Sequence, residues 1–189
     1  MSDDPAVTAL ALLRGCSATL ATAESLTGGL IGALLTAVPG ASHAYLGGAI
    51  TYATRLKATL AEVDEETLAA HGPVDPRTAA QMARGIARRC SADWGLAVTG
   101  VAGPDPQDGH PVGQVFVAVA RARDGETAVR ELRLTGDRAA IRSATARLAL
   151  ELLAERVGEE PDAGGAGGHA ADRAGPRGMD GDATDVDLP

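Results

Sequence analysis

The sequence has few aromatic residues, few cysteines and no long uninterrupted apolar run. Only 2% of its 189 residues are Phe, Trp or Tyr, so the core must be built from Ala, Leu, Val and Ile. Two cysteines, Cys16 and Cys90, are too few for a disulfide framework or a cysteine-rich metal site, which favours a reducing compartment. No apolar run is suited to spanning a membrane, and the acidic N-terminus lacks the basic region of a secretory signal. We therefore expect a cytoplasmic protein.

Positive charge is also scarce, and negative charge is concentrated at one end. The formal net charge is −8, and −6 of it follows residue 157, where eight acidic residues accompany two arginines. The rest of the chain is nearly neutral, so it lacks the basic surface that nucleic acid binds. Residues 158–189 consist largely of Gly, Ala, Asp and Pro. We expect one domain at 1–157 and a disordered acidic tail at 158–189.

Lysine is the rarest charged residue. The 17 basic residues are sixteen arginines and Lys57. Either one surface lysine has been retained by chance, or position 57 needs a group that can lose its proton. A buried lysine can act as a base or nucleophile, whereas arginine stays protonated. Lys57 is therefore a candidate catalytic residue.

Apolar periodicity predicts an α/β fold, a single layered domain with a mixed β-sheet flanked by helices. Asp75 and Asp137 are expected to cap the helices that follow them, and Asp124-Gly125 indicates a hairpin. The strand-to-helix connections should gather at one edge of the sheet, where α/β proteins bind ligands. The expected strands span 17–23, 46–52, 94–99, 112–120 and 127–134, and the expected helices span 6–13, 30–38, 55–61, 76–87 and 138–157.

The segment from Thr22 to Gly29 joins the first predicted strand to a predicted helix. Gly28 and Gly29 are expected in the first helical turn, where free N–H groups attract anions. Ser25 lies where a side chain is presented at the rim of the sheet. One interpretation is an ordinary βα turn capped by Ser or Thr. The other is a nucleophile on an anion-binding turn, with Thr27 as the cap.

Three predicted strand exits bring together Ser25, the pair Tyr52 and Lys57, and the Gly-rich segment Thr99–Pro104. A serine activated by a neutral lysine is a known arrangement for acyl transfer, and a tyrosine can relay a proton or hold the lysine pKa down. Backbone N–H groups near Leu26–Gly28 can form an oxyanion hole or instead hold a phosphate. A Tyr/Lys oxidoreductase is a weaker interpretation, because no G-x-G-x-x-G follows the first strand.

The histidines do not predict a metal site. None of them stands at a spacing typical of metal ligands, so we expect no metal. The four positions are His43, His71, His110 and His169.

Seven segments resemble, in the same order, the C-terminal domain family of competence-damage-inducible protein A (CinA). The resemblance covers about Leu10 to Leu153. The segments are AESLTGG (23–29), VPGAS (38–42), GGAITYATRLK (47–57), HGPVD (71–75), TGVAGP (99–104), PVGQV (111–115) and TGDR (135–138).

The characterised activity of that family is nicotinamide-nucleotide amidase, which converts nicotinamide mononucleotide to nicotinate mononucleotide and ammonia. The resemblance implies that Ser25, Tyr52 and Lys57 are the catalytic residues, with no cofactor. The phosphate of the nicotinamide mononucleotide is expected to bind one of two Gly-rich loops, and the sequence leaves the choice open. The residues expected to bind substrate are Glu24, Thr27, Gly28, Gly29, Ser42, Thr99, Gly100 and Gly103.

Several alternatives stay open. Glu24 either orients Lys57 or Thr99, or favours the helix N-terminus. The implied partner is a small nucleotide, with no nucleic acid and no membrane, and self-association is undecided. The alternative function is a non-catalytic nucleotide-binding or partner-binding domain of the same fold.

The sequence also departs from the family pattern. Leu26 stands where the family often has Cys, and Ala53-Thr54 replaces its usual Ser-Asn. Many relatives carry a molybdopterin-binding type of domain ahead of this one. Because about two dozen residues precede Ser25, we expect a stand-alone amidase-type domain.

Overall fold

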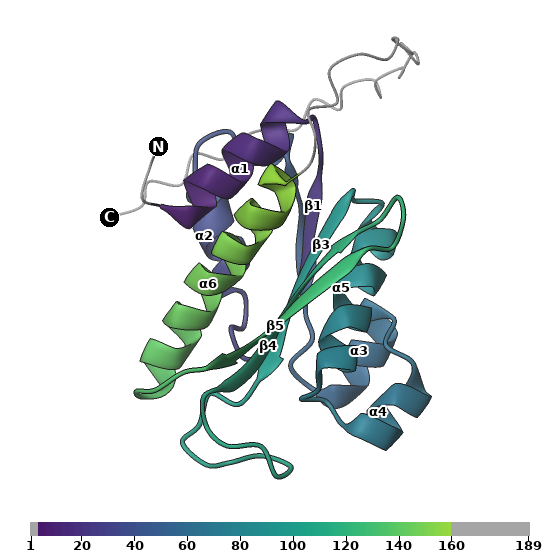
Figure 1. The fold of residues 1–189 in the computed structure, drawn as a ribbon, viewed down its shortest axis with the longest axis vertical. Coiled ribbons are helices and arrows are strands. Elements are labelled where there is room, and N and C mark those ends of the chain that lie inside the picture. The colour runs from purple at the N-terminus through teal and green to yellow at the C-terminus, as the bar shows by residue number, and fades with distance from the viewer. Residues whose placement is uncertain (1–3, 160–189) are drawn as a thin grey trace, which may run out of the picture.

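A five-stranded mixed sheet separates two helical layers in the computed structural model, which describes residues 4–159 (Figure 1). The strand order is β2-β1-β3-β4-β5; β1 pairs in parallel with β2 and β3, whereas β3, β4 and β5 are antiparallel. The expected mixed α/β sheet is therefore confirmed. The strands are β1 (Leu20–Glu24), β2 (Tyr45–Ile50), β3 (Trp94–Gly100), β4 (Gln114–Arg121) and β5 (Thr127–Arg133).

Helices form a layer on each face of the sheet (Figure 1). One layer contains α1 (Pro5–Gly15), α2 (Leu30–Thr36) and α6 (Arg138–Gly158), and the other contains α3 (Thr54–Ala61), α4 (Glu65–His71) and α5 (Pro76–Cys90). A short 3₁₀ turn, η1 (Ala41–His43), precedes β2. The predicted tail lies outside the described residues, apart from residues 158 and 159.

The core is aliphatic, as the scarcity of aromatic residues requires. The layer of α1, α2 and α6 packs mainly Leu, Ile, Val and Ala against the sheet. The opposite layer is dominated by Ala, which allows α5 to lie close to the strands. A Cβ added at Gly95 on β3 would stand 1.9 Å from the carbonyl oxygen of Ala83 on α5. The small side chains therefore determine how closely this layer approaches the sheet.

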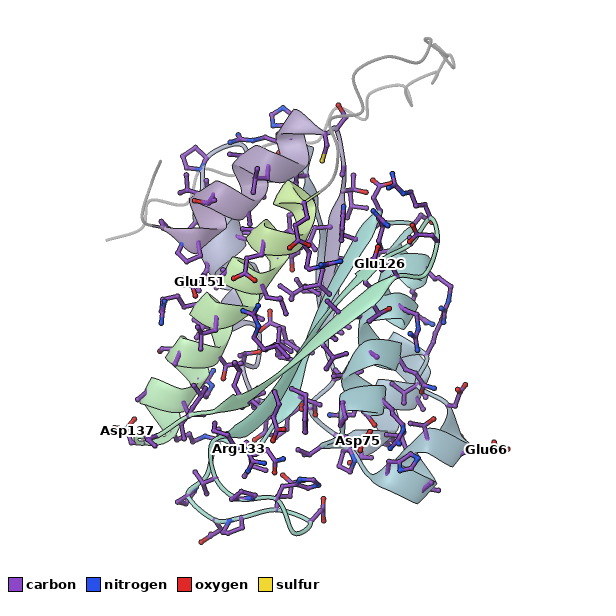
Figure 2. All side chains as sticks on the ribbon, viewed as in Figure 1. Glu66, Asp75, Glu126, Arg133, Asp137 and Glu151 are labelled. Atoms are coloured by element: carbon purple, nitrogen blue, oxygen red, sulfur yellow. The ribbon has the colours of Figure 1, made fainter. Side chains whose placement is uncertain are left out.

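The predicted caps and hairpin are confirmed. Asp75 accepts a hydrogen bond from the Arg77 N–H at 2.8 Å, and Asp137 accepts one from the Ala140 N–H at 2.8 Å. Figure 2 shows both carboxylates at the start of their helices. The turn around Asp124 connects β4 to β5.

Two local expectations were wrong. The sequence pattern did not predict α4, because none of its residues is buried and it has no apolar face to detect. Gly28 and Gly29 do not lie inside the first turn of α2. They precede it with φ of 60° and 97°, in the left-handed region that favours glycine.

The three parallel strands end at the same edge of the sheet, as expected. Ser25 follows β1, Tyr52 and Lys57 follow β2, and the segment Val101–Gly103 follows β3. Within residues 4–159, no helix is long and apolar enough to cross a membrane.

Candidate active site

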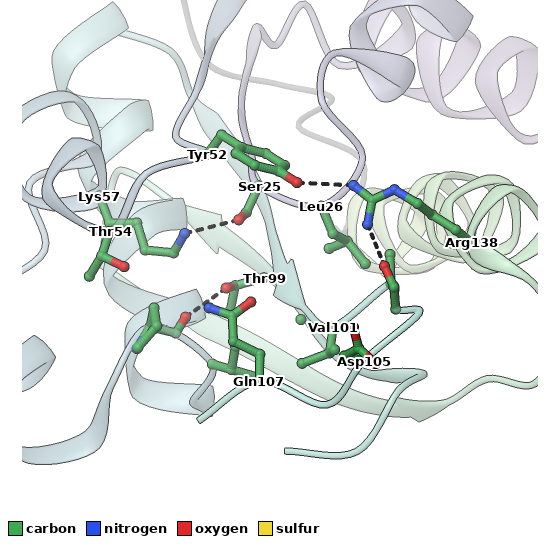
Figure 3. A pocket seen from close by; sticks show the side chains of 15 residues that line it. Ser25, Leu26, Tyr52, Thr54, Lys57, Thr99, Val101, Asp105, Gln107 and Arg138 are labelled. Atoms are coloured by element: carbon green, nitrogen blue, oxygen red, sulfur yellow. Dashed lines mark hydrogen bonds between the residues drawn. The ribbon is translucent and has the colours of Figure 1, made fainter. Parts of the chain in front are cut away.

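The centre of the site is a direct contact between Ser25 and Lys57 (Figure 3). Lys57 lies on the inward face of α3, where only it and Ala61 are buried, and its side chain is 1% exposed. Its Nζ is 2.9 Å from Ser25 Oγ and 2.9 Å from the carbonyl oxygen of Thr51. Burial lowers the pKa of Lys57 to about 8, because an ammonium group loses hydration there. The amine is therefore far easier to deprotonate than an exposed lysine.

Tyr52 lies at the opening of the site and is 60% exposed. Its hydroxyl accepts a hydrogen bond from Arg138 Nη2 at 2.9 Å, and Arg138 Nη1 donates to the carbonyl oxygen of Gly103 at 2.7 Å (Figure 3). Arg138 thus connects the second and third strand exits from the first turn of α6. Among the described residues, the hydroxyl of Tyr52 makes no hydrogen bond to Ser25 or Lys57.

These groups line a cleft of about 170 Å³ that opens at this edge of the sheet. Six of the predicted site residues line it: Ser25, Tyr52, Lys57, Thr99, Gly100 and Gly103. The other lining residues are Leu26, Thr54, Pro73, Val74, Val101, Ala102, Asp105, Gln107 and Arg138. The cleft therefore draws on all three strand exits, the loop before β4 and the start of α6.

Glu24 does not line the cleft; it is 2% exposed and directed at the start of α2. Its carboxylate accepts hydrogen bonds from the N–H groups of Gly29 at 3.0 Å, Ile31 at 3.1 Å and Gly32 at 2.8 Å. A carboxylate there satisfies orphan donors and complements the helix dipole. Of the alternatives considered from the sequence, this geometry matches stabilisation of the helix N-terminus.

Thr27 is not the cap of α2, so that prediction was wrong. Gly29 occupies the N-cap position, and Glu24 provides the capping side chain from five residues earlier. The hydroxyl of Thr27 is buried and is the one buried side-chain polar atom in residues 4–159 without a hydrogen-bond partner. Neither Thr27, Gly28 nor Gly29 lines the cleft.

Ser42 is exposed on η1, ahead of β2, whereas the cleft lies beyond the other end of that strand. Six extended residues span about 20 Å. The structure therefore does not bring Ser42 to the cleft.

Thr99 and Gly100 end β3 beside the cleft. The buried hydroxyl of Thr99 donates to the carbonyl oxygen of Pro73 at 2.6 Å, which ties β3 to the loop before α5. A Cβ at Gly100 would stand 2.5 Å from the carbonyl oxygen of Gln114 on β4. The absence of a side chain at Gly100 is therefore explained by strand packing.

Two backbone N–H groups after Ser25 remain available. The N–H of Gly28 donates to the carbonyl oxygen of Ser25 at 3.1 Å, but no hydrogen bond within residues 4–159 engages the N–H of Leu26 or of Thr27. Unpaired donors next to a nucleophile are the elements of an oxyanion hole.

The sequence interpretation missed Arg138, Asp105 and Gln107 as residues of the cleft. Arg138 belongs to the segment TGDR, but only Asp137 of that segment was given a role, as a helix cap. Asp105 and Gln107 lie in the loop before β4, which has no periodic pattern. Among residues 4–159, no group of three or more His, Cys, Asp or Glu side chains is arranged to hold a metal ion.

Fold and cleft together define an α/β domain with a buried serine–lysine pair at the carboxyl edge of its parallel strands. The chain belongs to the CinA C-terminal domain family, whose sequence model matches residues 3–157.

Relatives in sequence are named as CinA-like or competence-damage inducible proteins. A CinA-like protein of Frankia casuarinae is 50% identical over 153 residues, which is 81% of this chain and 35% of that protein. A putative competence-damage inducible protein of Acetivibrio thermocellus is 48% identical over 140 residues, 74% of this chain and 33% of that protein. The chain thus spans about a third of the length of these curated relatives.

Solved structures share the whole domain. The competence/damage inducible protein CihA of Agrobacterium tumefaciens has a TM-score of 0.77 at 36% identity, covering 84% of this chain and 98% of that one. A CinA superfamily protein of Klebsiella pneumoniae 700603 has a TM-score of 0.76 at 30% identity, covering 84% and 100% respectively. Those chains consist almost entirely of the fold described above.

Proposed function

We propose that this chain is an amidohydrolase that converts nicotinamide mononucleotide to nicotinate mononucleotide and ammonia, with Ser25 as nucleophile and Lys57 as base. The observation that carries the proposal is the 2.9 Å contact between Lys57 Nζ and Ser25 Oγ in a buried position. A hydroxyl within hydrogen-bond reach of a base is what acyl transfer requires. The substrate follows from the resemblance to the amidase family.

The protonation state of Lys57 determines whether it can act as a base. With a pKa of about 8, roughly a tenth of the amine is neutral at pH 7, compared with well under a thousandth for an exposed lysine. The carbonyl oxygen of Thr51 accepts one N–H of the amine. The lone pair of the neutral amine is then free to accept the proton of Ser25.

The reaction proceeds through an acyl-enzyme. Ser25 Oγ forms a bond to the carboxamide carbon as its proton passes to Lys57, and the carbonyl π electrons move to oxygen. The C–N bond then breaks, and the leaving nitrogen takes the proton from the Lys57 ammonium to depart as ammonia. Water repeats the sequence on the ester, with Lys57 accepting its proton and returning one to Ser25.

The oxyanion of both tetrahedral intermediates needs fixed donors. We assign this role to the N–H of Leu26, which has no other partner among the described residues and belongs to a residue that lines the cleft. The N–H of Gly28 is excluded because it is engaged by the carbonyl oxygen of Ser25. Each such donor typically contributes about 10²- to 10³-fold in turnover.

We propose that the substrate phosphate binds beside Arg138 and the segment 99–103. The alternative loop at 27–29 leads into the N-terminus of α2, which is already occupied by the carboxylate of Glu24. The guanidinium of Arg138 lines the cleft and has the planar donor geometry that fits phosphate. Tyr52, exposed at the opening, presents an aromatic face suited to the cationic pyridinium ring.

Ammonia release from nicotinamide mononucleotide tests the proposal. We expect purified protein to release ammonia, and Ser25→Ala and Lys57→Arg to lose about 10⁴-fold in turnover, as acyl-transfer triads do. Arg55→Lys, at an exposed position of the same helix, is the matched control and should stay within twofold. The rate should rise with pH around a midpoint of about 8, as Lys57 becomes neutral.

Two outcomes would contradict this assignment. Tight calorimetric binding of nicotinamide mononucleotide without ammonia release would favour the non-catalytic nucleotide-binding alternative. Turnover of Lys57→Arg within a few-fold of the unmodified protein would remove Lys57 as the base, since arginine cannot deprotonate.

A further inference from the structure

Arg142 on α6 uses its charge in an unusual way. Among residues 4–159, it forms no ion pair with a carboxylate, although many other arginines of this chain do. Instead its guanidinium donates to two backbone carbonyl oxygens: Nε to Leu26 at 3.0 Å and Nη2 to Thr27 at 2.7 Å. Both bonds are partly buried and link residues more than 110 positions apart. The guanidinium of Arg142 therefore contacts the turn after Ser25 and not its own helix, which indicates a role beyond stabilising α6.

The carbonyl of Leu26 belongs to the peptide unit whose N–H is that of Thr27. In a trans peptide the C=O and N–H point in opposite directions. Since Arg142 holds this C=O toward α6, the N–H is directed away from α6. Figure 3 shows that Ser25 and Leu26 lie between α6, with Arg138, and the helix that carries Lys57. Thr27 does not line the cleft, whereas Leu26 does, so the donor of this turn that can reach a bound substrate is the N–H of Leu26.

This peptide is the central one of a β-turn, the element whose orientation is most easily reversed. The turn spans Ser25 to Gly28 and is closed by the 3.1 Å bond from the Gly28 N–H to the Ser25 carbonyl oxygen. Reversing the central peptide converts a type I turn to type II and requires positive φ at the third residue. Thr27 does not have positive φ, so the turn holds the orientation that Arg142 favours.

We infer that Arg142 is a positioning residue for the oxyanion hole. By holding the carbonyl oxygens of Leu26 and Thr27, it fixes the turn Ser25–Gly28 and with it the N–H of Leu26, the donor of this turn that belongs to a residue lining the cleft. No other hydrogen bond within residues 4–159 engages the Leu26 carbonyl oxygen. The inference rests on the proposed nucleophile, Ser25, but not on the identity of the substrate.

The experiment tests the nucleophile separately from the identity of the substrate, because its probe needs no specific substrate. A small alkyl fluorophosphonate reacts with activated serines: the Oγ–P bond forms, fluoride leaves, and the serine proton passes to the base, here Lys57. The phosphoryl oxygen takes the place of the oxyanion. The rate of Ser25 labelling by mass spectrometry therefore measures the oxyanion hole, and Ser25→Ala gives the background.

We expect Arg142→Met to label about 10- to 100-fold more slowly, at or below the effect of removing one donor. Methionine keeps an apolar stem, and Arg147→Met is the matched control on the same helix, since the guanidinium of Arg147 bonds Glu151 instead. Arg142→Lys keeps the charge and can reach one carbonyl, so it should recover part of the rate. Arg147→Met should label like the unmodified protein, and thermal melting should show all variants folded.

The outcomes are distinct. Labelling of Arg142→Met within threefold of the unmodified protein overturns the inference, because the backbone of Thr27 would then hold the peptide unaided. Absence of Ser25 labelling in the unmodified protein overturns both the nucleophile and the inference. Fast labelling without ammonia release from nicotinamide mononucleotide removes only the proposed substrate. When ammonia is released, Arg142→Met should lower kcat and leave KM within about twofold, since Arg142 does not line the cleft.

Discussion

Replacing Lys57 by methionine should abolish activity and at the same time stabilise the fold near neutral pH. Methionine has a similar length and fills the buried volume without a charge. The Lys57 pKa falls from 10.5 to about 8, which means that burial of the ammonium group lowers the free energy of unfolding by about 3 kcal/mol at pH 7. Loss of the Nζ donors to Ser25 and Thr51 offsets part of this, at about 1 kcal/mol each. The net gain is about 1 kcal/mol.

The dependence on pH is the sharper part of this prediction. Below about pH 8, Lys57 is protonated in both the folded and unfolded states, and the full cost of burial applies. Between about pH 8 and 10.5 the unfolded chain holds a proton that the folded chain has released, so the free energy of unfolding rises with pH. Lys57→Met lacks this rise. Its advantage should therefore shrink above pH 8 and reverse to a loss of about 2 kcal/mol near pH 10.5.

Urea unfolding at pH 7, 8, 9 and 10 measures the effect as the difference between variant and unmodified protein. Other titrating groups cancel in that difference. Arg55→Met provides the control, because it removes an exposed cation of the same helix that stays protonated throughout. A difference between Lys57→Met and the unmodified protein that is constant from pH 7 to 10 would refute the lowered pKa, and with it the argument that Lys57 is poised as a base.

Two further substitutions test the turn before α2. Glu24→Gln keeps the shape of the side chain but replaces one acceptor oxygen by an NH₂ group. In the variant this NH₂ group faces a backbone N–H that donates to the carboxylate in the unmodified protein. We expect the free energy of unfolding to fall by about 1–3 kcal/mol, seen in thermal melting, and an unchanged melting temperature would contradict the capping role. Thr27→Val replaces a buried hydroxyl that has no partner by a methyl group of equal size. It should raise the free energy of unfolding by about 1 kcal/mol in urea titration, and a loss of that size would mean that the hydroxyl has a partner such as bound water.

Because some residue types are rare in this chain, much of its structure could be predicted from its sequence. With one lysine among 17 basic residues, position 57 stood out, and the strand pattern predicted that Ser25, Lys57 and Thr99–Gly103 would meet at one sheet edge. Caps at Asp75 and Asp137 were predicted because capping depends on neighbours two or three positions away. The exposed helix α4 escaped prediction because nothing on it is buried.

Other features depended on contacts between distant segments. Glu24 was ambiguous because its partners depend on the path of the turn, which positive φ at Gly28 and Gly29 directs back over the carboxylate. Arg138 and Arg142 reach the site from α6, whose position against the sheet is fixed by core packing.

The sequence by itself determined the alternation of strands and helices, the mixed sheet, and the choice of a serine and a lysine as candidate catalytic residues. These features follow from local periodicity and composition. Only the tertiary structure decided that Glu24 fills the N-terminus of α2, that Ser42 lies away from the cleft, and that Arg142 of the last helix holds the turn after Ser25. The physical reason is that these contacts depend on the path of the chain. The bonds of Glu24 require the turn to bend back over its carboxylate, and the bonds of Arg142 span more than a hundred residues, so neither leaves a periodic trace in the sequence.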